Sequence, residues 1–252
     1  MKIDSPTFLS ETTFISSSVV FSSGSQKFGN TLDDEHHFTG SLFITGSRID
    51  IDDGNKNTVL GNLAGDALTT AYDNVTIGYS AGTALTTAGR NVAIGKEALL
   101  VHTTGGNNIA IGHRAMFNTD AGSTSLGSNG NVAIGESVMG GAWANANSNS
   151  NIAIGNAAMG AAPLNGAISN IAIGYQALYD LTTGDYNTVA GHLAGTEMTT
   201  GEYNTIYGGF AGQNTLDVDS VVIIGASAGQ GVLTSDADGS VFIGREAGHA
   251  IT

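Results

Sequence analysis

The sequence contains no cysteine and is poor in proline, tryptophan and basic residues. Without cysteine the chain has no disulfide framework, thiolate metal ligand or cysteine nucleophile. Its 8 Lys and Arg against 22 Asp and Glu give a net charge of −14, and no basic cluster offers the counterion release that nucleic-acid binding requires. No apolar run approaches the length of about 18 residues that a membrane-spanning helix needs. We therefore expect neither a nucleic-acid-binding protein nor a membrane span.

Glycine is abundant, with 37 residues in 252. Charged residues make up only 12% of the chain, whereas hydrophobic residues reach 41%. A disordered chain shows the reverse balance, and collagen needs glycine at every third position together with much proline. The composition therefore indicates a folded, glycine-rich and charge-poor protein.

A five-residue phrase that ends in glycine, such as Asn-Val-Ala-Ile-Gly at 91–95, recurs eleven times. Asn opens nine of the eleven copies, and Ala stands three residues after the glycine in ten. The spacing is 17 residues in six of the ten steps. The closing glycines are Gly61, Gly78, Gly95, Gly112, Gly135, Gly155, Gly174, Gly191, Gly208, Gly225 and Gly244. Such regular self-similarity predicts a repeat architecture.

The repeat predicts an all-β fold. Seventeen residues are too few for two packed helices, and the β-branched phrase favours strands. We expect a strand, a glycine turn and a second short strand around the Ala in each unit, stacked as a parallel β-solenoid or β-roll of eleven repeats. Asn and Gly are expected at tight left-handed corners. The stacked Asn side chains are also expected to bond from coil to coil.

The strand phrase is apolar on both faces, whereas a thin coil has only one interior. The other face is therefore expected to meet another chain, which favours an oligomer. Residues 57–252 form the repeat domain. Residues 1–56 lack the repeat and are expected to be an extended, β-rich segment that pairs with partner chains.

The phrases Asn-Val-Ala-Ile-Gly-x-x-Ala and Leu-Thr-Thr-Gly-x-Tyr-Asn-Thr resemble the β-roll repeats of trimeric autotransporter adhesin heads and, more closely, those of phage tail-fibre proteins. The leader, from Phe28-Gly29-Asn30 to Gly46-Ser47, is similar to the N-terminal region of marine and cyanobacterial phage fibre proteins. We find neither the signal sequence nor the membrane barrel that an autotransporter needs, which favours the phage fibre.

The resemblance implies a homotrimeric virion fibre, on the tail or the capsid. Its N-terminal segment would bind other virion proteins, and its far end would contact a host surface receptor, with a glycan as one candidate. A bacterial surface adhesin is the alternative. No cofactor is implied.

We expect no enzymatic activity. Ser80 and Ser227 lie in Gly-x-Ser-x-Gly motifs, but the repeat's own Gly and Ala-Gly positions generate this pattern. A polysaccharide-degrading spike would need carboxylates brought together across chains. Recurrent Thr-Thr pairs suggest an ice-binding face, but Asp120, Trp143 and Pro163 interrupt them. Both functions are disfavoured.

Two groups of residues have the chemistry of metal ligands. They are His36 with His37, and Asp50 with Asp52 and Asp53. Adjacent strand residues point to opposite faces, and the acidic group lacks the spacing of an EF-hand. Polar turns are therefore the favoured interpretation of both groups, and of the similar pair Asp236 and Asp238.

Extra residues in a solenoid often emerge on its binding face, and this repeat lengthens after Gly112, Gly135, Gly155 and Gly225. One interpretation is that the single Trp stacks on a sugar while nearby polar groups bond its hydroxyls. The other is that this Trp fills the trimer interior. The candidate receptor residues are Trp143, Asn145, Asn147, Asp120 and Ser123.

Overall fold

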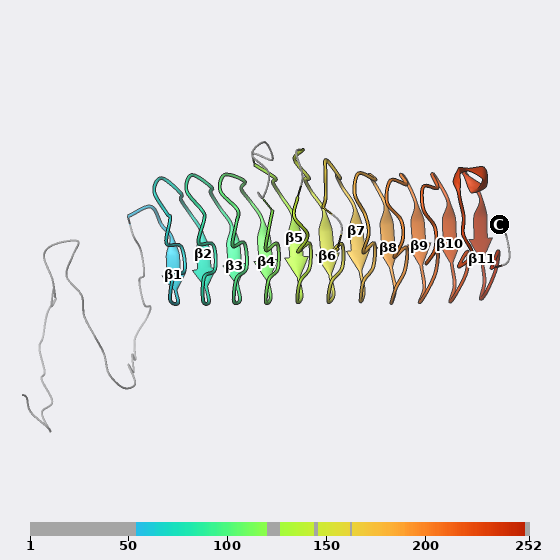
Figure 1. Cartoon of the computed structure of the whole chain (residues 1–252), viewed down its shortest axis with the longest axis horizontal. Coiled ribbons are helices and arrows are strands. Elements are labelled where there is room, and N and C mark those ends of the chain that lie inside the picture. Colours follow the sequence, from blue (N-terminus) through green and yellow to red (C-terminus); the bar gives the residue numbers. More distant parts are fainter. Residues whose placement is uncertain (1–53, 120–126, 144–145, 162, 250–252) are drawn as a thin grey trace, which may run out of the picture. The chain divides into compact units, whose positions relative to one another are not determined.

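The computed structural model describes residues 54–119, 127–143, 146–161 and 163–249. The chain divides between Ile49 and Asp50 into two units, and all described residues belong to the second. This unit is a parallel β-solenoid of stacked coils, each contributing one three-residue strand (Figure 1). The predicted all-β solenoid of eleven repeats is confirmed. The strands are β1 (Thr58–Leu60), β2 (Val75–Ile77), β3 (Val92–Ile94), β4 (Ile109–Ile111), β5 (Val132–Ile134), β6 (Ile152–Ile154), β7 (Ile171–Ile173), β8 (Thr188–Ala190), β9 (Thr205–Tyr207), β10 (Val222–Ile224) and β11 (Val241–Ile243).

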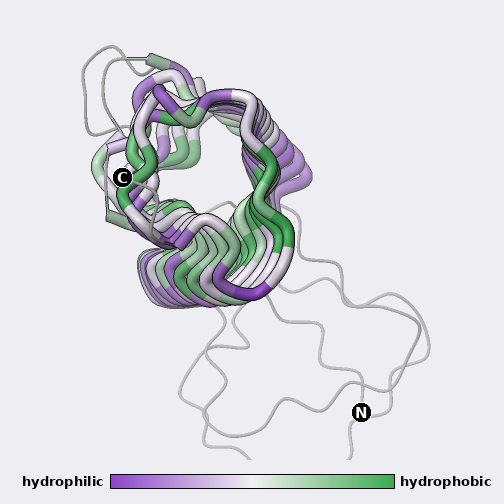
Figure 2. The backbone as a smooth tube through the Cα atoms, turned by 90° about the vertical axis from the view of Figure 1, so that its right-hand side faces the viewer, coloured by the Kyte–Doolittle hydropathy of each residue, from purple (hydrophilic) through white to green (hydrophobic). Residues whose placement is uncertain are grey.

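We number each coil after its strand. The strands form one sheet in the order β1 to β11, and every neighbouring pair is parallel and in the same register. Ile111 pairs with Ile134 although 23 residues separate them, so the longer repeats leave the register unchanged. Viewed along the stack, the coils superimpose closely (Figure 2). The one helical element among the described residues is the 3₁₀ turn η1 (Ser235–Ala237), which lies in the lengthened repeat after Gly225.

The second strand expected around the Ala is not formed. The residues after each closing glycine form a turn, with left-handed backbone at the second and fourth positions. In coil 3 these are Glu97, with φ of 60°, and Leu99, with φ of 49°. Coil-to-coil hydrogen bonds persist, since the Glu97 amide donates to the Tyr79 carbonyl at 2.9 Å. Left-handed corners two residues apart bend the chain too sharply for a regular strand.

The closing glycines lie where neighbouring backbones approach most closely. Gly78 has a φ of +129°, and a Cβ there would lie 2.7 Å from the carbonyl oxygen of Gly95 in the next coil. Any side chain at this position would therefore push the coils apart. This close approach explains the closing glycine of the first ten coils, whereas at Gly244, in the last coil, nothing lies within 4 Å and only its positive φ of +119° favours glycine.

The opening asparagines form a buried ladder through the stack. The Oδ1 of Asn151 accepts hydrogen bonds from the backbone N–H of Asn170 at 3.0 Å and from its Nδ2 at 3.1 Å. The Nδ2 of Asn151 donates to the Ala167 carbonyl at 2.8 Å. The predicted coil-to-coil bonding is confirmed, but the expectation of left-handed asparagines is wrong. The preceding residue, such as Arg90 with φ of 61°, is left-handed instead.

The middle residue of each strand points inward and faces the residue six positions later across the coil interior. A Cβ on Gly212 would lie 3.1 Å from the Cδ1 of Ile206, which shows how closely the two positions approach. When the strand residue is Ala, the facing residue is Leu or Met, and when the strand residue is larger, the facing residue is Gly. The first type comprises Ala93–Leu99, Ala110–Met116, Ala133–Met139, Ala153–Met159 and Ala172–Leu178. The second comprises Val59–Gly65, Thr76–Gly82, Val189–Gly195, Ile206–Gly212, Ile223–Gly229 and Phe242–Gly248. The interior volume is therefore shared between the two walls.

Candidate functional site

The first and third residues of every strand point away from the coil interior and are half-buried or exposed. Leu60 is 58% exposed at one end of the solenoid, and Ile243 is 65% exposed at the other. We call these twenty-two positions the outer stripe. They are Thr58, Leu60, Val75, Ile77, Val92, Ile94, Ile109, Ile111, Val132, Ile134, Ile152, Ile154, Ile171, Ile173, Thr188, Ala190, Thr205, Tyr207, Val222, Ile224, Val241 and Ile243.

The outer stripe holds no charged residue, whereas the turns after the closing glycines of coils 3 and 4 carry several. The Arg114 Nε donates to the Glu97 Oε2 at 2.7 Å, and the Lys96 Nζ lies 3.4 Å from the Glu97 Oε1. The hydrogen bond from Arg114 holds the pKa of Glu97 below its usual range. An apolar, uncharged centre beside a charged edge is the composition of a protein interface rather than of an ordinary surface.

Coils 8 and 9 interrupt the apolar composition of the stripe. Their outer residues are Thr188, Ala190, Thr205 and Tyr207 in place of Val and Ile. A shallow depression of about 360 Å³ lies at this point. It is lined by Ile173, Ala190, Gly191, Tyr207, Gly208 and Gly209. Because Ala190 stands between two larger side chains on the neighbouring strands, the stripe has a hole here followed by a projection.

Exposed aromatic residues border the same region. Tyr175 stacks on His192 with ring centroids 5.2 Å apart, and the His192 ring contacts Phe210 edge-on at 5.2 Å. Tyr186 and Tyr203, which immediately precede two asparagines of the ladder, stack on each other with ring centroids 5.0 Å apart. These rings pack against one another from coil to coil, so their stacking is explained by the repeat itself.

The structure places Trp143 inside the solenoid, where its side chain is 1% exposed and belongs to the hydrophobic core. The interpretation of this ring as an exposed platform for a sugar is therefore wrong for this conformation. The lengthened repeat after Gly135 leaves room for the ring inside the coil. The asparagines around Trp143 in the sequence do not indicate whether its ring points inward or outward. Asn147 is exposed, whereas Asp120, Ser123 and Asn145 lie outside the described residues.

The main metal candidates His36, His37, Asp50, Asp52 and Asp53 also lie outside the described residues. Within the described part of the chain, no group of three or more His, Asp or Glu side chains is placed to hold a metal ion. Asp236 and Asp238 are both exposed at or beside η1, and the Oδ1 of Asp238 accepts the backbone N–H of Asp219 at 2.7 Å.

The serine motifs and the threonine pairs occupy ordinary repeat positions. Ser80 occupies the same turn position as Glu97, is only 7% exposed and is followed by a turn rather than a helix, so neither the strand-to-helix turn of a nucleophile elbow nor its exposure is present there. The hydroxyl of Thr69 donates to the Thr86 carbonyl at 2.8 Å, and the hydroxyl of Thr182 to the Thr199 carbonyl at 2.9 Å. These threonines connect successive coils.

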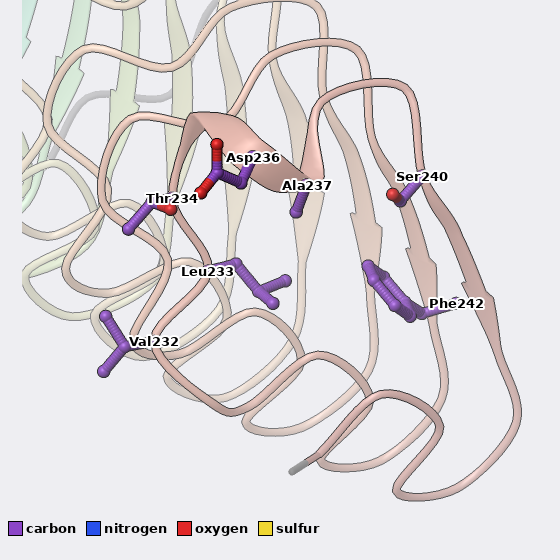
Figure 3. A pocket seen from close by; sticks show the side chains of 7 residues that line it. All are labelled: Val232, Leu233, Thr234, Asp236, Ala237, Ser240 and Phe242. Atoms are coloured by element: carbon purple, nitrogen blue, oxygen red, sulfur yellow. The ribbon is translucent and has the colours of Figure 1, made fainter. Parts of the chain in front are cut away.

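A second, smaller cavity of about 160 Å³ opens in the last coils, between η1 and β11 (Figure 3). Leu233, Ala237 and Phe242 supply its apolar lining, with Asp236 and Ser240 at its margin. It continues the coil interior and is smaller than the roughly 300 Å³ or more of typical small-molecule sites. Across the described residues, no helix is long and apolar enough to cross a membrane.

Comparison with protein-family models, with curated proteins and with solved structures finds no match to this chain. The outer stripe is therefore the candidate site that the fold itself presents. Its apolar composition was visible in the sequence. The substitutions at Ala190 and Tyr207 were visible too, but their meaning depends on knowing that both side chains point outward on adjacent strands.

Proposed function

We propose that this chain is a structural protein of a phage virion, in which its solenoid forms a homotrimeric rod that takes part in host attachment. The observation that carries the self-association is the outer stripe. Its twenty-two positions match the roughly 20–30 residues per partner of a standard protein interface. Left in water, these side chains would form an apolar strip along coils 2 to 7 and again along coils 10 and 11, which soluble monomers rarely tolerate.

The geometry favours parallel copies arranged around an axis along the rod. All eleven strands are parallel and form one sheet along one side of the solenoid. In a cyclic arrangement, each copy would therefore turn the same stripe toward its neighbours along its full length. The assignment to a phage particle rests on the resemblance of the repeats and of the leader at 28–47 to fibre proteins. Attachment through the N-terminal segment and contact with a host receptor follow from the same resemblance.

Native mass spectrometry tests the self-association. We expect a complex of about 76 kDa, three times the 25.4 kDa of one chain. Placing a charge in the stripe with Ile134→Glu should dissociate it, because the carboxylate would have to be desolvated in the interface. The matched control is Thr104→Glu, which adds the same charge at an exposed position of the threonine turn. A soluble monomer of the unmodified chain at micromolar concentration contradicts the proposal.

Electron microscopy tests the location. Antibodies raised against residues 57–252 should label intact phage particles in lysates of the producing cells. Label confined to the surface of bacterial cells would instead support the adhesin and overturn the assignment to a virion.

A further inference from the structure

The sequence contains two Asn-Gly pairs, Asn129-Gly130 and Asn165-Gly166, and both lie in lengthened repeats. An asparagine amide is chemically labile when glycine follows it, because glycine has no Cβ to obstruct the approach of its backbone nitrogen to the side-chain carbonyl carbon. In both pairs the asparagine is exposed and the glycine has a positive φ, of +68° at Gly130 and +90° at Gly166. Sequence and exposure alone therefore give the two pairs the same lability.

Hydrogen bonds distinguish the two asparagine side chains. The Oδ1 of Asn129 accepts the backbone N–H of Gly106 at 2.7 Å, and its Nδ2 donates to the Gly127 carbonyl. Both ends of this amide are thus held, and its Cγ can turn toward the Gly130 nitrogen only when these bonds break. In contrast, no described residue is hydrogen-bonded to the side chain of Asn165. That side chain is therefore free to rotate toward the nitrogen of Gly166.

The attacking nitrogens of the two pairs differ much less. The N–H of Gly130 donates to the Gly106 carbonyl at 3.1 Å. The N–H of Gly166 donates to the Oγ of Ser148 at 3.2 Å, which is at the long end of the usual range. Attack requires the loss of one such bond in either pair. A difference in reactivity between the pairs must therefore come from the asparagine side chains.

We propose that Asn165 is a site of spontaneous deamidation in the folded protein, and that the fold protects Asn129 from the same reaction. The nitrogen of Gly166 bonds to the Cγ of Asn165, and the Cγ–Nδ2 bond breaks. The proton of the glycine N–H passes through water to the departing amide nitrogen, which leaves as ammonia. One water molecule then opens the five-membered imide at either of its carbonyls, which leaves aspartate or isoaspartate at position 165. The reaction consumes one water, releases one ammonia and needs no oxidant or reductant.

The modification changes the charge of the rod while its coils stay joined. Each event adds one negative charge to a chain with a net charge of −14. The backbone N–H of Asn165 donates to the Thr182 carbonyl at 2.9 Å and links coils 6 and 7. This N–H precedes the rearranged bond, so both products retain it. In isoaspartate the additional main-chain carbon lies between positions 165 and 166, where it displaces the Gly166 N–H from Ser148.

Peptide mapping by mass spectrometry tests the proposal on the full chain. The freshly purified protein is kept folded in a mildly alkaline buffer, which favours loss of the glycine N–H proton, and samples are denatured and digested at intervals. Replacement of NH₂ by OH raises the mass of the peptide, and fragmentation assigns the position. We expect the modified fraction to grow roughly tenfold or more faster at Asn165 than at Asn129, because two hydrogen bonds hold the Asn129 amide.

Two controls isolate the contribution of the fold. In guanidinium chloride at the same pH the unfolded chain should modify both pairs at similar rates, because only the shared Asn-Gly chemistry remains. The control variant Asn165→Gln keeps an exposed amide, but its longer side chain would have to close a six-membered ring, which is much slower. It should abolish the acidic species that accumulates on anion exchange and leave the slow reaction at Asn129 unchanged.

Equal rates at the two asparagines in the folded protein, or a faster rate at Asn129, would overturn the inference. Modification of Asn165 only after unfolding would overturn it as well, because the fold would then protect both pairs. None of these outcomes bears on self-association, which is read from the mass of the complex.

Discussion

The exchange of volume across the coil interior predicts that two damaging substitutions compensate when combined. Coil 8 is of the second type, with Val189 on the strand and Gly195 facing it, and it adjoins coil 7, which is of the first type with Ala172 and Leu178. The double variant Val189→Ala with Gly195→Leu should convert coil 8 to the first type. The boundary between the two types then moves by one coil, and the new contact between coils 7 and 8 is one that two neighbouring coils of the first type already make elsewhere in the solenoid.

The magnitudes follow from the local geometry. Val189 is fully buried, so Val189→Ala removes about two methylene equivalents and leaves a small cavity, at a cost of about 2 kcal/mol. A Cβ on Gly195 would lie 3.3 Å from the Leu178 Cδ2 and 3.6 Å from the Val189 Cγ1. Gly195→Leu therefore overpacks the interior and also places leucine at a φ of +55°, at a combined cost of about 3 kcal/mol.

Combined, the substitutions should cost about 2 kcal/mol rather than the additive 5, because the new side chain fills the space that the valine leaves. The remaining cost is the left-handed leucine, which Leu178 already tolerates at a φ of 49°. The assay is urea unfolding followed by circular dichroism. The control joins Val189→Ala to Gly82→Leu in coil 2, six coils or roughly 29 Å away, where additivity is expected. A coil 8 double variant as unstable as the sum of its single variants would refute the reasoning.

Three further predictions concern the buried polar and aromatic groups. Asn151→Ala should lower the free energy of unfolding by about 3 kcal/mol or more, because Asn170 loses its acceptor and the Ala167 carbonyl loses its donor. The control is Asn156→Ala at an exposed position, which should change the free energy of unfolding by less than about 0.5 kcal/mol. Trp143→Ala should lower the melting temperature, since it empties a core site at a cost of about 3–5 kcal/mol, and an unchanged melting temperature would contradict the burial of this ring. His102 is fully buried, with its Nε2 3.2 Å from the Asn108 Nδ2, which can only donate, and its Nδ1 2.9 Å from the Thr119 Oγ1. His102→Leu should lower the free energy of unfolding by about 1–3 kcal/mol in urea unfolding, because it leaves the buried Thr119 hydroxyl without the His102 Nδ1.

The repeat columns explain why so much of the fold was predictable. A residue that recurs at one offset in nearly every copy makes the same contact in nearly every coil, so the role of Asn151 in the ladder follows from its column alone. The predictions that were wrong concern the direction in which the Trp143 ring points and the backbone conformation at the corners of the coils. Six coils have glycine at the fourth position of the left-handed turn, but coil 3 has Glu97 and Leu99 at its two left-handed positions, so the repeat as a whole did not indicate that a turn would replace the second strand.

The candidate site was only partly predictable. Trp143 occurs once, in a repeat of unusual length, so no column indicates whether its ring points inward. The two coil types can be read in the sequence at a constant offset of six residues: an Ala on the strand is followed by Leu or Met, and a larger strand residue is followed by Gly. It becomes interpretable only when the fold shows that these two positions face each other.

The eleven copies act as a comparison within one molecule, and that comparison separates the outer stripe from the rest of the surface. The first residue after each closing glycine is also exposed, and it varies freely, as Lys96, His113, Glu136, Asn156 and Tyr175 illustrate. The outer positions of β2 to β7, and again those of β10 and β11, are Val or Ile without exception. Water does not impose such a restriction, and no described part of the chain covers these side chains. The proposed self-association accounts for this restriction, because a second copy of this chain would repeat with the same period.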